Sequence, residues 1–180
     1  RIVTLLENRY YNFKGLNLTY ETLDGLIKHN GPMTDLVKLN NILGNNFFKK
    51  KIIFSNRPSL EAQIASISDD IAYNSHDLED GLRAELFNLE DLKNLPVLDK
   101  ILVKHKGKLK YFSQDLVLRQ IIRDTINEMV KDIILNTKKN MKKNKINNIK
   151  DVYKSEHPIV CFSKKMSSFD LNIKEFLKKN

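Results

Sequence analysis

The feature that most constrains the fold is one long amphipathic segment, Pro58 to Gly81. At about 100° per residue, apolar positions spaced three, four and seven apart form a single stripe on a helix. The segment is therefore predicted to be a helix that buries this stripe in a core. The stripe consists of Leu60, Ile64, Ile67, Ile71, Leu78 and Leu82.

The opposite side of this predicted helix is acidic. It carries Asp69, Tyr73, Asp77 and Asp80, with His76 beside them. Carboxylates four residues apart repel one another and destabilise a helix, so their accumulation needs a reason. A bound cation, or a phosphate-bearing substrate with its own metal, would supply one. A solvated acidic surface is the other interpretation that this spacing allows.

Helix signals dominate the rest of the chain and predict an all-α fold. Thr19 is a suitable N-cap for a helix that runs to His29, and Asn30-Gly31-Pro32 is predicted to end it. Alternation with a period of two residues, which would indicate strands, is nearly absent. Further helices are predicted at about 1–9, 36–43 and 58–87, on each side of Pro96, at 113–136 and at the C-terminal end.

Composition excludes several classes of protein. The 180 residues contain one cysteine, Cys161, which excludes an internal disulfide or a cysteine-based metal site and fits a reducing compartment. No apolar run approaches the length needed to span a bilayer, so the expected location is the cytoplasm, with no membrane partner.

The net charge of +9 is concentrated after residue 100, and residues 137–150 are nearly all Lys and Asn. Such a stretch can bind nucleic acid through phosphates. It contains no aromatic side chain on which bases could stack, which favours a solvated connector.

Three stretches resemble one protein family. SDDIAYNSHDLEDG (68–81), LNLTYETLDGLIKHNGP (16–32) and HPIVCFSKKM (157–166) are similar to the bacterial deoxyguanosine triphosphate triphosphohydrolase-like proteins of the HD-domain superfamily. The resemblance implies an HD-domain-type helical bundle. It also implies a family reaction, in which metal-assisted attack of water at the α-phosphorus of a deoxynucleoside triphosphate releases the deoxynucleoside and intact triphosphate.

The resemblance also implies roles for individual residues. The family spacing D-x-x-x-Y-x-x-x-D fits Asp69 as a metal ligand, Tyr73 against the deoxyribose and Asp77 as a polar contact. Asp70 is the rival ligand. Lys28 matches a position where a Lys approaches the triphosphate, although a Lys in a last helical turn also suits the helix dipole. The expected cofactor is a divalent cation, Mg or Mn.

The family's first His and its His-Asp pair are expected upstream of Arg1, and no catalytic acid or base is assigned here. Arg1 opens an apolar-periodic run that has no capping residue, which predicts a C-terminal piece of a larger enzyme, incomplete at the N-terminus. The predicted organisation is a partial phosphohydrolase domain at 1–136, a basic connector at 137–151 and a C-terminal helical segment of the same enzyme at 152–180.

The family further implies a deoxynucleoside triphosphate substrate and a homo-oligomer. Two alternatives remain open at this point: a catalytically inactive remnant of the family, and a basic helical module that binds nucleic acid.

Overall fold

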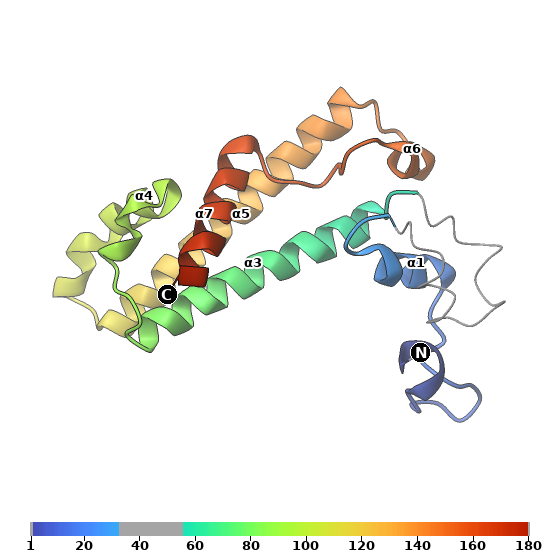
Figure 1. The fold of residues 1–180 in the computed structure, drawn as a ribbon, viewed down its shortest axis with the longest axis horizontal. Coiled ribbons are helices and arrows are strands. Elements are labelled where there is room, and N and C mark those ends of the chain that lie inside the picture. Colours follow the sequence, from blue (N-terminus) through green and yellow to red (C-terminus); the bar gives the residue numbers. More distant parts are fainter. Residues whose placement is uncertain (1, 33–55, 180) are drawn as a thin grey trace. The chain divides into compact units, whose positions relative to one another are not determined.

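The computed structural model describes residues 2–32 and 56–179, which form helices and connecting loops with no β-strand among them (Figure 1). The all-α prediction is confirmed. The helix expected at 36–43 lies outside the described residues. The helical elements are η1 (Ile2–Leu6), α1 (Tyr20–Lys28), α3 (Leu60–Arg83), η2 (Asp91–Asn94), α4 (Pro96–His105), η3 (Lys106–Lys110), α5 (Gln114–Lys143), α6 (Ile149–Lys154) and α7 (Lys164–Lys179).

The chain divides into two compact units, and the boundary falls within α3. The first unit comprises Arg1–Ser66 with Asn144–Ile159, and the second comprises Ile67–Lys143 with Val160–Asn180. Within the described ranges, no helix combines the length and the apolar character needed to cross a membrane.

In the first unit, both ends of α1 form as the sequence predicts. The Thr19 hydroxyl accepts a hydrogen bond of 3.2 Å from the Thr22 amide, which satisfies one free donor of the first turn. After the last turn, Gly31 adopts a φ of +109°, and its amide donates to the Lys28 carbonyl at 2.7 Å. A side chain at Gly31 would strain this backbone, so glycine is the residue that ends the helix cleanly.

The first unit is joined across a large sequence separation by Gln63, at the start of α3. Its buried amide nitrogen donates to the Pro58 carbonyl at 2.9 Å, and its oxygen accepts from the Ile159 amide at 2.9 Å. Arg57 adds a backbone bond of 3.1 Å to the Tyr153 carbonyl in α6. These bonds hold the segment around α6 against the beginning of α3.

The buried side of α3 differs in part from the predicted stripe. Ile71 and Leu78 are buried as expected, but Ile64 is 48% exposed, so the prediction for that residue is wrong. Asn74 and Ser75 are buried instead. Polar side chains can lie in a core when they are hydrogen-bonded, and the Asn74 amide donates to a buried carboxylate, that of Asp170 in α7.

The loop that follows α3 contacts α7 through an aromatic pair. The rings of Phe87 and Phe176 meet edge to face, with centroids 4.8 Å apart and planes at 80°. Phe87 lies directly over Gly81, where a Cβ atom would collide with its ring. Glycine at this helical position is therefore explained by the close approach of Phe87.

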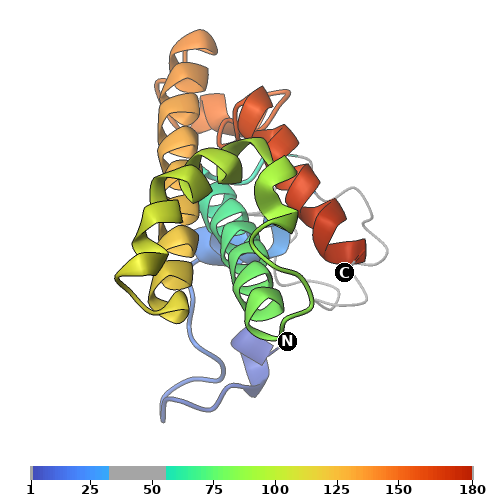
Figure 2. The same cartoon turned by 90° about the vertical axis from the view of Figure 1, so that its left-hand side faces the viewer.

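In the second unit, α4 packs against the first half of α5. Leu98, Ile101 and Leu102 of α4 and Val117, Leu118 and Ile121 of α5 are buried apolar residues on these two helices. Figure 2 shows α5 as one continuous helix. It extends to Lys143, beyond the end near Asn136 that the sequence predicted. Residues 137–143 contain neither Gly nor Pro, and lysines suit the C-terminal end of a helix.

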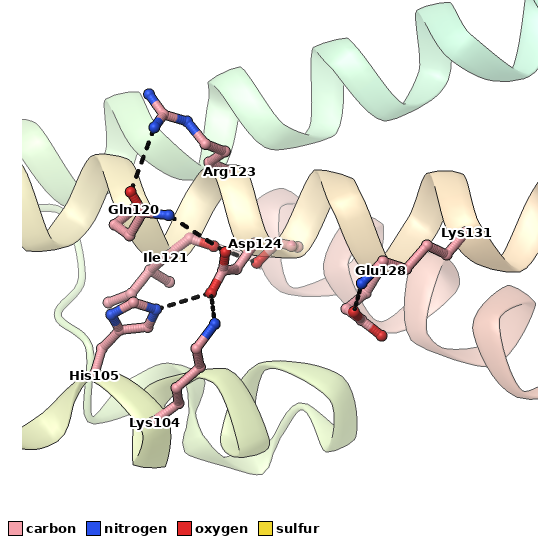
Figure 3. A network of polar contacts seen from close by, with 9 residues as sticks. Lys104, His105, Gln120, Ile121, Arg123, Asp124, Glu128 and Lys131 are labelled. Carbon is pink, nitrogen blue, oxygen red and sulfur yellow. Dashed lines mark hydrogen bonds and ion pairs between the residues drawn. The ribbon is translucent and has the colours of Figure 1, made fainter.

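A partly buried polar network links α4 to α5 beside this apolar contact (Figure 3). One oxygen of Asp124 lies 2.6 Å from the Lys104 ammonium and 2.9 Å from Nε2 of the buried His105. Gln120 donates to the other oxygen at 3.4 Å. Hydrogen bonds from Lys104 and then from His105 lower the pKa of Asp124 from 3.8 to about 2, although burial acts in the opposite direction.

The Asp124 network predicts a pH-dependent contribution to stability. Because the pKa is lower in the folded state, this contribution is present above pH 3.8 and is lost as the pH falls toward about 2. Asp124→Asn should lower the free energy of unfolding by about 2 kcal/mol at neutral pH, and the difference from the unmodified protein should shrink across that range. Urea titrations followed by the circular dichroism of the helices measure both quantities.

The matched control for this prediction is Glu128→Gln, which breaks an exposed ion pair with Lys131 on the same helix. Solvent screens exposed ion pairs, so this variant should change the free energy of unfolding little. Equal losses in the two variants, or a difference that does not change with pH, would contradict the assignment.

Candidate functional site

Three of the predicted site residues form a row along α3. Asp69, Tyr73 and Asp77 are four residues apart, so their side chains leave the same side of the helix one above the other. All three are exposed, and Tyr73 is 65% exposed. A solvent-exposed aromatic ring between two carboxylates can bind a ligand that has both an apolar surface, which packs on the ring, and polar groups, which the carboxylates contact.

The two carboxylates of this row make neither a hydrogen bond nor an ion pair with any residue that the structure describes. Within 2–32 and 56–179 there is also no group of three or more His, Cys, Asp or Glu that would hold a metal ion. Carboxylate oxygens suit Mg²⁺ and Mn²⁺. Asp69 therefore fits as one ligand of such a cation, but the described residues do not by themselves complete its coordination.

Asp70 occupies a different side of α3 from Asp69. Successive helical residues are about 100° apart, and the Asp70 carboxylate lies 3.5 Å from the Lys174 ammonium of α7. Burial lowers the pKa of Lys174, but the hydrogen bond and charge of Asp170, with Asp70 adding to them, outweigh burial and raise it. Lys174 is therefore a cation that already engages Asp70, which leaves Asp69 as the unengaged carboxylate.

Lys28 lies in the first unit, and its ammonium is internal rather than exposed. Only 2% of its side chain is accessible, and Nζ lies 2.6 Å from the carboxylate of Asp24, one turn earlier in α1. The same nitrogen is 5.8 Å from the centre of the Tyr153 ring in α6. The described structure thus shows Lys28 neutralised by a buried partner.

A groove of about 540 Å³ lies beside this ion pair in the first unit. Small residues, Gly25, Ala62 and Ala65, line it together with Tyr153. Burial, followed by the charges of Asp24, Glu21 and Glu61, raises the pKa of the Tyr153 hydroxyl above its ordinary value of 10.0. Tyr153 therefore stays protonated at neutral pH.

Among the described residues, no cluster of possible metal ligands includes His29, His105 or His157. His105 is buried against Asp124, and Nδ1 of His29 lies 2.8 Å from the Leu26 carbonyl at the end of α1. His157 is exposed. His29 and His105 therefore each have a polar partner within the described structure.

Sequence reasoning missed the partners of two buried carboxylates, Asp24 and Asp170. The spacing of Asp24 and Lys28 by one helical turn could have identified their ion pair. Asp170 and Lys174 have the same spacing in α7. No comparable signal exists for the bond between Asp170 and Asn74, because these residues are 96 positions apart. Such pairs form only when the helices pack.

Comparison with known proteins agrees with the family resemblance. The chain is 54% identical over 178 residues to the deoxyguanosinetriphosphate triphosphohydrolase-like protein of Pelagibacter ubique (strain HTCC1062), a match that covers 99% of this chain and 48% of that protein. Proteins with the same name from Rickettsia prowazekii and Bartonella tribocorum are 38% and 37% identical, over 99% and 100% of this chain and 46% of each of them. This chain is homologous to these proteins along its whole length.

The chain spans about half the length of the curated relatives it matches. No protein-family model matches it. The resemblance that the three sequence stretches indicated is confirmed, and the helical structure is consistent with an HD-domain bundle.

The ion pair of Lys28 and Asp24 generates a stability prediction. Lys28→Met keeps the length of the side chain but leaves the Asp24 carboxylate buried without a partner, which should cost about 3–5 kcal/mol of unfolding free energy. The double variant Lys28→Met/Asp24→Leu should recover most of the loss, because it removes the unpaired charge. Urea unfolding of both variants measures these effects.

Lys93→Met is the control, since it breaks an exposed pair with Glu90. If Lys28→Met costs no more than this control, the internal ion pair contributes nothing to the stability of the first unit.

Proposed function

We propose that this chain forms part of a metal-dependent deoxynucleoside triphosphate triphosphohydrolase. The observation that carries the proposal is the row of Asp69, Tyr73 and Asp77, which is exposed and unengaged on a helix whose other side is fixed in the core. The row matches the family spacing residue by residue, and the homologous proteins carry the triphosphohydrolase-like name.

In this proposal Asp69 supplies one carboxylate ligand to a divalent cation, Mg²⁺ or Mn²⁺. The other ligands come from the part of the longer relatives that this chain does not match. When bound, such a cation neutralises phosphate charge and lowers the pKa of a water molecule. Asp70 is the weaker candidate for the ligand, because its charge is already partly balanced by Lys174.

Tyr73 is proposed to pack against the deoxyribose, one turn along α3 from Asp69. A sugar packed on the ring would leave little room for a 2′-hydroxyl, which would favour deoxynucleotides. Asp77 would make a polar contact further along the same side. Such discrimination by packing and exclusion is worth about 1–3 kcal/mol.

Lys28 is proposed to approach the triphosphate. Its ammonium is paired with Asp24 in the described structure, so contact with a phosphate would require exchange of the Asp24 carboxylate for phosphate oxygens.

The complete enzyme is proposed to be a cytoplasmic homo-oligomer. An inactive family remnant is the alternative. Nucleic-acid binding is not preferred, because residues 137–150 contain no aromatic side chain.

A chimera tests the proposal. In it, this chain replaces the matching segment of the Pelagibacter ubique relative, with which it shares 54% identity. We expect the chimera, but not the 180-residue chain alone, to release triphosphate from deoxyguanosine triphosphate when Mg²⁺ or Mn²⁺ is present. If the chimera is inactive while the unmodified Pelagibacter ubique protein is active, the alternative of an inactive family remnant is favoured.

Within an active chimera, Asp69→Asn should reduce turnover to background and weaken cation binding, because the amide keeps the shape but not the charge of the ligand. Asp70→Asn is the control at the neighbouring residue, and it should retain most of the turnover and most of the cation affinity. Triphosphate release and Mn²⁺ titration measure them, and circular dichroism checks that helix content is unchanged. If Asp70→Asn is the inactive variant, the assignment of Asp69 as the metal ligand is wrong, and so are the roles of Tyr73 and Asp77 that depend on it.

Tyr73→Ala in the chimera should reduce the preference for deoxyguanosine triphosphate over guanosine triphosphate by about 1–3 kcal/mol, with a smaller effect on cation affinity. Tyr73→Phe should keep the preference, since it retains the ring. The ratio of kcat/KM for the two nucleotides is the measurement. An unchanged ratio in Tyr73→Ala would remove the sugar-packing role.

A further inference from the structure

A polar cluster lies between α3 and α7, on the side of α3 next to the row of Asp69, Tyr73 and Asp77. Its centre is the Asp170 carboxylate, which is 7% exposed. One oxygen accepts from the Asn74 amide at 2.9 Å, and the other lies 2.9 Å from the Lys174 ammonium. Both oxygens of this buried carboxylate are therefore engaged, one by α3 and one by its own helix.

On α3, residues of the cluster directly follow residues of the row in the sequence. Asn74 follows Tyr73 directly, and Asp70, which Lys174 also reaches at 3.5 Å, follows Asp69. Adjacent residues on a helix point about 100° apart. Whatever fixes the direction of Asn74 consequently fixes the direction of Tyr73, and the same holds one turn earlier for Asp70 and Asp69.

Apolar packing alone would fix this direction weakly. The hydrophobic effect is non-directional, so Ile71 and Leu78 would remain buried after a small rotation of α3. A hydrogen bond to a buried carboxylate has a narrow range of lengths and angles, and leaving either partner unsatisfied in the core is costly. The bond between Asn74 and Asp170 therefore sets the rotation of α3 more sharply than the apolar contacts do.

We propose that Asn74, Asp170 and Lys174 are positioning residues for the candidate site, which hold α3 in the rotation that presents Asp69 and Tyr73 to cation and sugar. This inference rests on the proposed function. The three residues touch no substrate; they act through the helix that carries the row. Partners that hydrogen-bond a metal ligand directly typically change metal affinity or activity by about 10- to 100-fold when they are removed, and residues that act through the helix should reach the lower end of this range.

The test uses the same chimera. Asp170→Asn keeps the shape of the side chain but removes the charge that holds Lys174 and weakens the bond to Asn74. We expect kcat and Mn²⁺ affinity each to fall by about 10-fold, with a reduced preference for deoxyguanosine triphosphate over guanosine triphosphate. The reciprocal double variant Asn74→Asp/Asp170→Asn restores one amide and one carboxylate in the cluster, and it should recover part of each loss.

Two further variants separate positioning from general destabilisation. Glu128→Gln makes the same chemical change at an exposed ion pair on α5 and should alter none of the three readouts. Lys174→Gln is a milder change, because the Lys174 side chain is 34% exposed, and it decides the matter if Asp170→Asn loses its helical signal. Under the proposal, Lys174→Gln lowers Mn²⁺ affinity while circular dichroism and thermal unfolding stay close to those of the unmodified chimera.

The outcomes separate this inference from the proposed function. If Asp69→Asn is inactive but the folded cluster variants keep kcat, Mn²⁺ affinity and nucleotide preference, the positioning role is overturned and the proposed function stands. If the cluster variants lose activity only in proportion to lost helix, and the reciprocal double variant recovers nothing, the cluster is merely structural and the inference is again overturned. If Asp69→Asn stays fully active, the proposed function itself fails.

Discussion

The structure depends most on the packing that buries one side of α3 and leaves the adjacent side exposed to solvent. Leu78 and Ile71 supply the apolar contact, and the hydrogen bond between Asn74 and the buried Asp170 adds direction to it. Burial removes apolar area from water without specifying angle, whereas an amide–carboxylate bond specifies angle as well as distance. Together they leave Asp69, Tyr73 and Asp77 on the exposed side.

Among the residues that the structure describes, the buried charged side chains are paired with a partner of opposite charge. Lys28 meets Asp24 in α1, and the Asp124 carboxylate receives Lys104 and His105 across α4 and α5. A buried charge without a partner would lower the free energy of unfolding by several kcal/mol, because it loses its hydration and gains no opposite charge. The carboxylates of Asp69 and Asp77 differ from this pattern, since they lack partners among the described residues and are exposed.

The candidate site was accessible from sequence because it lies on one helix. Positions four apart share a side of a helix whatever the rest of the fold does, so the row of Asp69, Tyr73 and Asp77 followed from spacing and family resemblance. The spacing to Tyr73 favoured Asp69 over Asp70, whereas the contact of Asp70 with Lys174 is visible only once α7 packs beside α3. The exposure of Ile64 was likewise not visible in the apolar spacing.

The sequence by itself determined the local structure: helices, their caps at Thr19 and Gly31, and the all-α class, because these follow from interactions between residues a few positions apart. Tertiary structure decided which polar residues are buried and what they bind. Asn74 meets Asp170, and His105 meets Asp124, only because separate helices pack together. A hydrogen bond between distant positions leaves no periodic trace in one sequence, so packing alone reveals it.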